Sequence, residues 1–133
     1  AYQLDEVSRG LKSLAKELQC VVLCLAQLNR QADELPYDAM PTMSHLRDCG
    51  AIEQDADVVM LLKRPIVCKP ELQGDWQNYA KLAVAKSRQG ATGIVHLHYH
   101  GSQTRFDGWW GGVPQRSEPA AMPAKRGFQG GPD

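Results

Sequence analysis

The alternation of apolar and polar positions predicts an amphipathic helix near the start of the chain. Across residues 5–18, apolar side chains recur at steps of three and four residues, and most charged side chains fall between them. This spacing places the apolar side chains on one face of a helix. An unbroken apolar run at residues 21–26 follows, as in a strand that is covered on both faces. A helix followed by a buried strand predicts an α/β crossover unit.

Breaks in the apolar pattern divide the rest of the chain into a long loop and several short elements. Residues 29–44 contain Pro36 and Pro41 among acidic and small side chains, which predicts an exposed and mobile loop. A turn at Gln89 and Gly90 predicts that the strands on either side of it pair as an antiparallel hairpin. The expected elements are a short helix at residues 50–56 and strands at residues 57–62, 79–85, 93–99 and 104–106.

The composition of the chain changes after Asp107. Residues 111–133 are dominated by Gly, Pro, Ala and scattered charges, so they bury too little apolar surface to offset their chain entropy. A chain of 133 residues, of which 43% are hydrophobic, suits one modest domain. We therefore predict a folded domain at residues 1–107 and a disordered tail at residues 108–133. Trp109 and Trp110 are expected to close off the last strand.

The overall charge and the cysteines narrow the possible functions. With 15 acidic and 15 basic side chains there is no net positive field, so any contact with DNA must be local. No apolar run approaches the roughly 20 residues that span a bilayer, and there is no signal peptide. The four cysteines lack a zinc-like spacing, and we expect Cys20 and Cys24 to be small buried side chains. Reduced thiols indicate a cytoplasmic protein.

Three segments carry the most specific signal in the chain. Residues 46–57 read LRDCGAIEQDAD and run directly into an apolar stretch, residues 27–30 read QLNR, and residues 83–93 read AVAKSRQGATG. Alone, the first segment is typical of a polar loop that caps a strand. Together, and in this order, the three segments closely resemble the C-terminal part of the RecA-like motor domain of DnaB-type replicative DNA helicases. The resemblance covers residues 6–107.

The sequence departs from this family at four positions. His45 stands where the family usually has Asp, Asp48 replaces Glu, Cys49 replaces Ser, and Ala91 replaces Pro. The pattern of charges survives these changes. The resemblance implies an α/β fold, a partial RecA-like P-loop ATPase core made of its C-terminal strands and helices.

The phosphate-binding motif of such an ATPase is absent from the sequence. No Gly-x-x-x-x-Gly-Lys-Ser/Thr segment occurs, and the acidic strand end that holds magnesium is missing too. We therefore expect the chain to be a fragment, with ATP and Mg²⁺ bound mainly by a part before residue 1. Alone, the fragment is expected to be inactive.

Gln27, Lys86 and Arg88 are the candidate catalytic residues. Gln27 ends an apolar run, where a polar strand cap and a ligand-binding side chain are equally good interpretations from position alone. Lys86 and Arg88 lie two residues apart at the end of a strand, so their side chains share one face. Both charges therefore point the same way and need an anion between them. The resemblance implies that Gln27 senses the terminal phosphate. It also implies that Arg88 is an arginine finger, with Lys86 as its partner, acting on the nucleotide of a neighbouring subunit. The alternative for the pair is a solvated basic edge.

The resemblance implies that Arg47, Asp48 and Gly50 form a DNA-binding loop. Arg47 suits a phosphate, Gly50 lets the backbone approach the strand closely, and Asp48 would orient Arg47. Such contacts read the DNA backbone in any sequence. We expect the loop at residues 29–44 to carry Arg47 away from Gln27.

His96, His98 and His100 alternate along one predicted strand, which at first sight indicates a metal site. Val95, Leu97 and Tyr99 occupy the other face, however, as in any half-exposed strand. We therefore predict a solvated face and no metal site.

The resemblance implies part of a hexameric, ATP-dependent replicative DNA helicase that translocates on single-stranded DNA and unwinds duplex. Its partners would be single-stranded DNA, identical subunits in a homohexamer, a helicase loader and a primase, with no membrane. Two alternatives remain open. One is another RecA-like DNA-dependent ATPase of recombination or repair, and the other is an inactive truncated remnant that acts only as a weak binding module.

Overall fold

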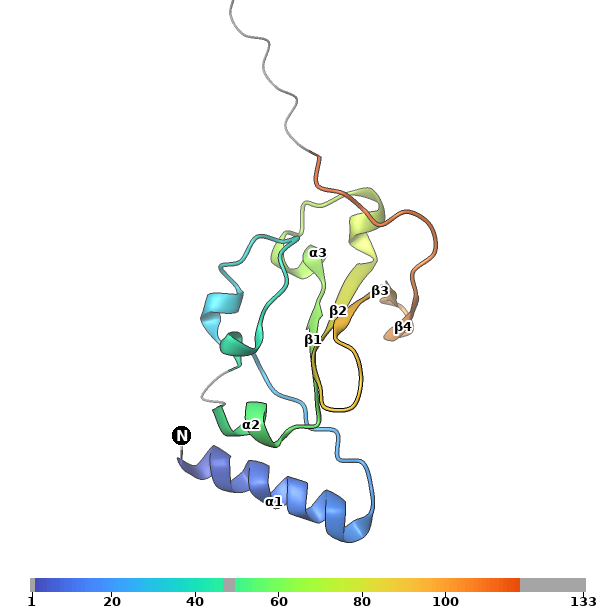
Figure 1. The fold of residues 1–133 in the computed structure, drawn as a ribbon. Coiled ribbons are helices and arrows are strands. Elements are labelled where there is room, and N and C mark those ends of the chain that lie inside the picture. The colour runs from blue at the N-terminus through green and yellow to red at the C-terminus, as the bar shows by residue number, and fades with distance from the viewer. Residues whose placement is uncertain (1, 47–49, 118–133) are drawn as a thin grey trace, which may run out of the picture.

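The computed structural model describes residues 2–46 and 50–117 of the chain. Two helices, α1 (Tyr2–Leu18) and α2 (Gly50–Asp55), lie in contact at one end of the molecule, and a four-stranded sheet extends away from them (Figure 1). The strands are β1 (Val58–Lys63), β2 (Tyr79–Ser87), β3 (Gly93–His100) and β4 (Arg105–Gly108), and a short helix, α3 (Pro65–Cys68), follows β1. Among the described residues, no helix has the length and apolar character needed to cross a bilayer.

The sheet has the order β1-β2-β3-β4, and each strand runs antiparallel to its neighbour. The predicted hairpin is confirmed, since Tyr79 lies opposite His98 and Val84 lies opposite Gly93. Each helix and strand predicted from residue 50 onward is present, with no end shifted by more than two residues. Hydrophobic periodicity and turn residues were sufficient to place these elements.

A β-bulge interrupts the pairing of β1 with β2. Val59 lies opposite Lys86 and Met60 lies opposite Val84, so Ala85 has no partner in the register. A bulge of this kind bends the strand and redirects the side chains beside it. Lys86 therefore lies beside a point where β2 is locally distorted.

The predicted buried strand at residues 21–26 is wrong. This segment has no strand conformation, and its side chains are exposed: Val21 is 93% accessible and Leu25 is 89% accessible. Cys20 and Cys24 are exposed as well, against expectation. The apolar run identifies a segment suited to burial, but a strand also needs a hydrogen-bonded neighbour. In the described ranges, no strand lies beside residues 21–26, so the α/β crossover unit does not form there.

The core of the domain is centred on Tyr79 at the start of β2, which is fully inaccessible. The rings of Trp76, His96 and Trp109 lie 5.6, 5.9 and 5.1 Å from the Tyr79 ring. The Tyr79 hydroxyl lies 2.5 Å from Nδ1 of His96, which gives this buried polar group a partner. Trp109 thus closes the end of the sheet as predicted, whereas Trp110 is 88% accessible.

The loop at residues 29–44 is closed at its base and attached to the sheet. The backbone N–H of Asn29 donates to the carbonyl oxygen of His45 at 2.7 Å. Lys63 of β1 donates to the carbonyl oxygen of Pro36 at 2.8 Å, and Lys81 of β2 donates to that of Asp38 at 3.2 Å. Burial lowers the pKa of Lys63. The segment is a loop, as predicted, but it is held against the sheet at two points.

Candidate functional site

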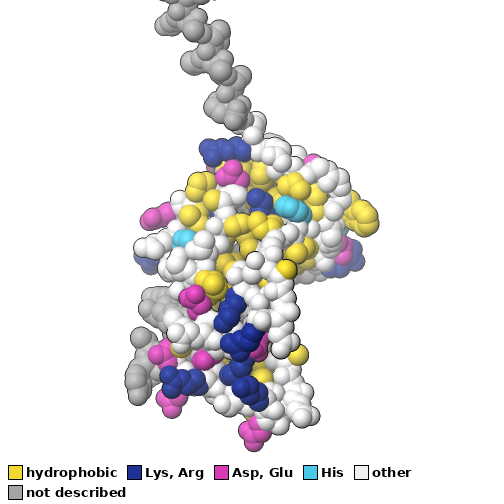
Figure 2. Space-filling view, viewed as in Figure 1, with side chains coloured by type: hydrophobic (Ala, Val, Ile, Leu, Met, Phe, Trp, Pro, Cys, Tyr) yellow, Lys and Arg dark blue, Asp and Glu magenta, His cyan; other side chains and the backbone are white. Residues whose placement is uncertain are grey.

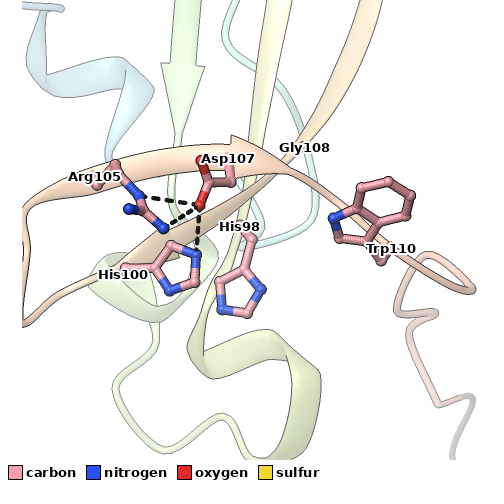
Figure 3. A pocket seen from close by; sticks show the side chains of 6 residues that line it. All are labelled: His98, His100, Arg105, Asp107, Gly108 and Trp110. Atoms are coloured by element: carbon pink, nitrogen blue, oxygen red, sulfur yellow. Dashed lines mark hydrogen bonds and ion pairs between the residues drawn. The ribbon is translucent and has the colours of Figure 1, made fainter.

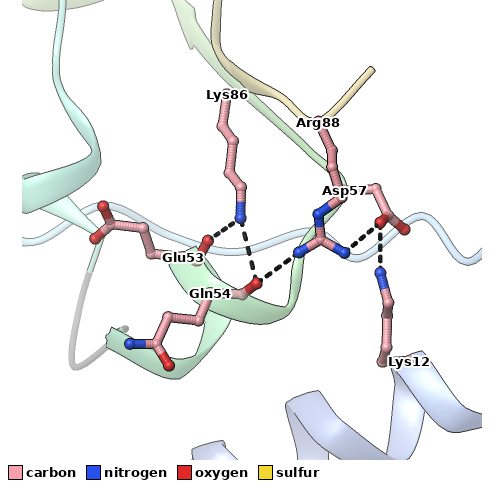
Figure 4. A network of polar contacts seen from close by, with 6 residues as sticks. All are labelled: Lys12, Glu53, Gln54, Asp57, Lys86 and Arg88. Carbon is pink, nitrogen blue, oxygen red and sulfur yellow. Dashed lines mark hydrogen bonds and ion pairs between the residues drawn. The ribbon is translucent and has the colours of Figure 1, made fainter. Parts of the chain in front are cut away.

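Lys86 and Arg88 reach from the end of β2 to the C-terminal end of α2 (Figure 4). The Lys86 ammonium donates to the carbonyl oxygens of Glu53 and Gln54, the latter at 3.3 Å. The Arg88 guanidinium donates through Nη2 to the same Gln54 oxygen at 2.9 Å. The two cations therefore converge, which confirms the prediction that both charges point the same way.

The end of α2 explains why two cations meet there. The last four carbonyl groups of an α-helix have no partner inside the helix. In α2, the carbonyl oxygen of Ile52 accepts from the backbone N–H of Ala56 at 2.9 Å. The next two carbonyl groups along the chain accept from Lys86 and Arg88. The pair thus caps the helix, and the partial negative charge at a helix C-terminus stabilises cations.

Asp57 supplies the negative charge of this site. Its carboxylate accepts from Arg88 Nη1 at 2.9 Å and from the ammonium of Lys12 in α1. The backbone N–H of Arg88 also donates to the Asp57 carbonyl oxygen at 2.9 Å, so the two residues meet at two points. Neither Asp57 nor Lys12 was assigned a role from the sequence. The position of Asp57 beside the start of β1 was the only available signal.

These contacts favour the ionised form of the Asp57 carboxylate. The hydrogen bond from Lys12 is the largest cause that holds the pKa of Asp57 below its ordinary value. The positive charges of Lys12, Arg88 and Lys16 act in the same direction.

Lys and Arg side chains gather in the lower half of the view in Figure 2, near α1 and α2, while hydrophobic side chains dominate the upper half over the sheet.

The site is open to solvent on one side. The Arg88 side chain is 45% accessible and that of Asp57 is 62% accessible. A guanidinium has five N–H donors and an ammonium has three. The contacts described above occupy only some of them, so both cations retain donors for an anionic ligand. This arrangement suits the oxygens of a phosphate group.

Gln27 does not join Lys86 and Arg88 within this structure. Its side chain is exposed, and it follows the exposed segment at residues 21–26. The next residue, Leu28, forms an isolated antiparallel bridge with Leu46. The two ends of the loop at residues 29–44 therefore lie together, while the predicted separation of Arg47 from Gln27 concerns a residue outside the described part of the chain.

Two of the three candidate DNA-binding residues, Arg47 and Asp48, lie outside the described residues. Gly50, the third, is exposed and begins α2. Helix α2 therefore comes directly after the predicted DNA-binding segment in the sequence. Lys86 and Arg88 donate to carbonyl oxygens at the C-terminal end of this helix.

A second cluster lies at the other end of the sheet, on β3 and β4 (Figure 3). It lines a pocket of about 420 Å³. The rings of His98 and His100 stack 4.2 Å apart, and the Asp107 carboxylate lies 3.0 Å from His100 Nε2 and 2.7 Å from Arg105 Nη2. His98 and His100 are half-buried, and the His96 ring is hydrogen-bonded to the Tyr79 hydroxyl. Among the described residues, no group of three or more His, Cys, Asp or Glu side chains is placed to hold a metal ion.

Comparisons with known proteins identify the family of this chain. Residues 1–108 match the model of the family described as DnaB-like helicase C terminal domain. A replicative DNA helicase DnaB of Leifsonia xyli is 46% identical over 104 residues, which cover 78% of this chain and 22% of that protein. The corresponding protein of Haemophilus influenzae is 41% identical over 105 residues, covering 79% of this chain and 22% of its own length. The chain thus spans less than a quarter of these relatives.

Solved structures show the same relationship. A structure described as an ATPase domain is similar with a TM-score of 0.72 and 35% identity, over 82% of this chain and 37% of that chain. A DnaB-like replicative helicase, whose structure was described with its interactions with primase, is similar with a TM-score of 0.71 and 36% identity. It matches 79% of this chain and 24% of its own.

The chain belongs to the DnaB-like helicase C-terminal domain family. The predicted fold class, the C-terminal part of an α/β RecA-like ATPase core, is confirmed by these matches. In the described residues this part consists of the antiparallel sheet, with α1 and α2 at one end.

Proposed function

We propose that this chain is part of a hexameric, ATP-dependent replicative helicase that translocates on single-stranded DNA and unwinds duplex DNA. The observation that carries the proposal is the convergence of Lys86 and Arg88 on one carbonyl oxygen, with N–H donors left open to solvent. Two cations held side by side at an exposed edge suit a phosphate group offered by another subunit. Membership of the helicase family supports the assignment.

In this proposal Arg88 acts on the nucleotide of the neighbouring subunit. Its guanidinium stabilises negative charge that develops on the phosphate oxygens in the transition state, and Lys86 adds a second donor. Gln27 senses the terminal phosphate of the nucleotide. ATP supplies the bond that is cleaved, and Mg²⁺ neutralises charge on its phosphates; both are held mainly by a part of the helicase that lies outside this chain.

Arg47, Asp48 and Gly50 are assigned to the DNA in this proposal. Arg47 pairs with a backbone phosphate, and Gly50 permits close approach of the main chain. The partners are single-stranded DNA, five further copies of the helicase, a loader and a primase, all in the cytoplasm. A primase is named with one similar structure, which supports that partner.

The exposed apolar surface supports a longer parent protein. Residues 21–26 expose Val21, Leu23 and Leu25, and β1 exposes Met60 and Leu62 on one face. Apolar patches of this kind normally lie against another part of a protein. We propose that further strands of the same helicase cover them. The 133-residue chain alone is then expected to have no ATPase activity, and robust magnesium-dependent hydrolysis by it would contradict the proposal.

Substitution of Arg88 in the parent helicase tests the catalytic assignment. Arg88→Ala should abolish ATP hydrolysis while ATP binding persists, because the finger stabilises charge that develops only in the transition state. A variant of the parent's phosphate-binding lysine, also inactive alone, provides the second subunit type. Mixed hexamers of the two variants should regain activity, since some interfaces then contain both intact halves. Failure of every mixture to recover would show that Arg88 does not act across the interface.

The two alternative functions predict different results. A RecA-like ATPase of recombination or repair would hydrolyse ATP with DNA but would not separate a forked duplex in a strand-displacement assay. A truncated remnant would show no ATPase activity even when the matching upstream half is supplied. The Lys86 and Arg88 pair favours the helicase over both, because it retains an intact cationic site.

A further inference from the structure

Asp57 and Arg88 are joined by more than a surface ion pair. The Arg88 backbone N–H donates to the Asp57 carbonyl oxygen, and Arg88 Nη1 donates to the Asp57 carboxylate, both at 2.9 Å. The other end of the guanidinium, Nη2, donates to the Gln54 carbonyl oxygen at 2.9 Å. A planar group bonded at two separate nitrogens has a fixed orientation, whereas one contact would leave it free to rotate.

Lys12 prevents Asp57 from cancelling the charge of the site. The same carboxylate oxygen, Oδ1, accepts from both Lys12 and Arg88. Two cations, Lys12 and Arg88, thus contact one carboxylate, and Lys86 adds a third positive charge at the end of α2, so the cluster keeps a net positive charge. An acidic side chain beside a phosphate-binding arginine is therefore tolerated here, because its charge is shared with a cation that lies on α1 (Figure 4).

We propose that Asp57 is a positioning residue for Arg88, which it holds in a fixed orientation before a phosphate of the neighbouring subunit arrives. This inference rests on the proposed function of Arg88. An exposed arginine side chain samples many rotamers, and ordering it during the reaction would add to the barrier. Asp57 and the end of α2 impose that order in advance, which is how preorganised electrostatic stabilisation works. Asp57 itself touches no phosphate, because two anions repel.

Asp57→Asn in the parent helicase tests the inference with minimal change of shape. The neutral amide removes the charge that Arg88 Nη1 contacts. We expect kcat for ATP hydrolysis to fall by about 10- to 100-fold, with KM for ATP and hexamer assembly unchanged. Asp57→Glu keeps the charge and should retain more activity than Asp57→Asn.

Lys12→Gln is the matched control for a purely structural role of Asp57. This substitution removes the ion pair that joins Asp57 to α1 but leaves the ion pair between Asp57 and Arg88. The inference predicts a smaller loss of kcat than for Asp57→Asn, and an equal loss would overturn it. Full activity of Asp57→Asn combined with an inactive Arg88→Ala enzyme would also overturn the inference, while the proposed function would stand. If Arg88→Ala itself remained active, the proposed function would fail instead.

Discussion

Leu28 and Leu46 pair through an isolated antiparallel bridge that closes the loop at residues 29–44. The pairing places the residue after Gln27 beside the residue before Arg47. In sequence, the proposed phosphate sensor Gln27 directly precedes this bridge, and the segment proposed to bind DNA directly follows it. A contact of this kind offers a short route between the two sites, and it depends on very few hydrogen bonds.

Asn29→Pro tests the importance of this closed base. Asn29 has a φ of −73°, which proline adopts without strain, so the change removes the N–H that donates to His45 together with the Asn29 side chain. Leaving the carbonyl oxygen of His45 unpaired should lower the free energy of unfolding by about 1–3 kcal/mol. In the parent helicase, stimulation of ATP hydrolysis by DNA should fall more than basal hydrolysis. Asn29→Ala, which keeps the N–H, is the control; an equal effect of both variants would assign the role to the side chain.

The buried hydroxyl of Tyr79 provides a second prediction. Tyr79→Phe keeps the ring and removes the hydrogen bond to His96, so the free energy of unfolding should fall by roughly 1 kcal/mol. Tyr79→Ala removes the ring from between Trp76 and Trp109 and should cost about 3–5 kcal/mol. Urea denaturation followed by tryptophan fluorescence measures both changes. Equal stability of the Phe and Ala variants would show that the ring cluster is not the centre of the core.

The ionisation of Asp57 provides a prediction about pH. The pKa of Asp57 is lowered from its ordinary value of 3.8, and the hydrogen bond from Lys12 is the largest cause. The stabilisation from this carboxylate is therefore present above its ordinary pKa and is lost as the pH falls through the lowered value. Carboxyl NMR titration should give a midpoint below 3.8. Lys12→Gln should raise that midpoint more than Arg88→Ala does, and the reverse order would show that Arg88 dominates.

Arg47→Ala in the parent helicase tests the DNA assignment. Binding of single-stranded DNA should weaken about equally for all sequences, and the slope of log affinity against log salt should fall by about one for each phosphate that is no longer paired. Basal ATP hydrolysis should fall less than its stimulation by DNA, because Arg47 is assigned to DNA and not to the nucleotide. Normal DNA affinity together with an absence of basal hydrolysis would place Arg47 at the nucleotide instead.

The elements from residue 50 onward were predictable because their signals are local. Short apolar-rich segments define β2 and β3, and Gln89 and Gly90 supply the turn that joins them. Residues 21–26 carried an equally strong apolar signal, yet they form no strand in the described part of the chain. The sequence indicates that these side chains favour burial, but not which neighbour buries them.

The candidate site was predictable in part for a similar reason. Alternation along β2 is sufficient to place Lys86 and Arg88 together, and the need for a compensating negative charge follows from electrostatics. The sequence does not reveal which carboxylate supplies that charge. Asp57 is joined to Lys12, which lies 45 positions away in the chain. Lys63 is another example, since its burial under the loop depends on a carbonyl group 27 residues away. Long-range partners of this kind are decided by the tertiary fold.

The anchoring of the loop at residues 29–44 has a consequence for sequence divergence. Lys63 and Lys81 both bind main-chain oxygens, those of Pro36 and Asp38, and every amino acid provides such an oxygen. The attachment therefore places little demand on the side chains of the loop itself. For these two contacts selection needs to retain only the lysines on the sheet, so the exposed side chains of the loop are free to change, and with them any partner that the loop contacts, without loss of the two anchors.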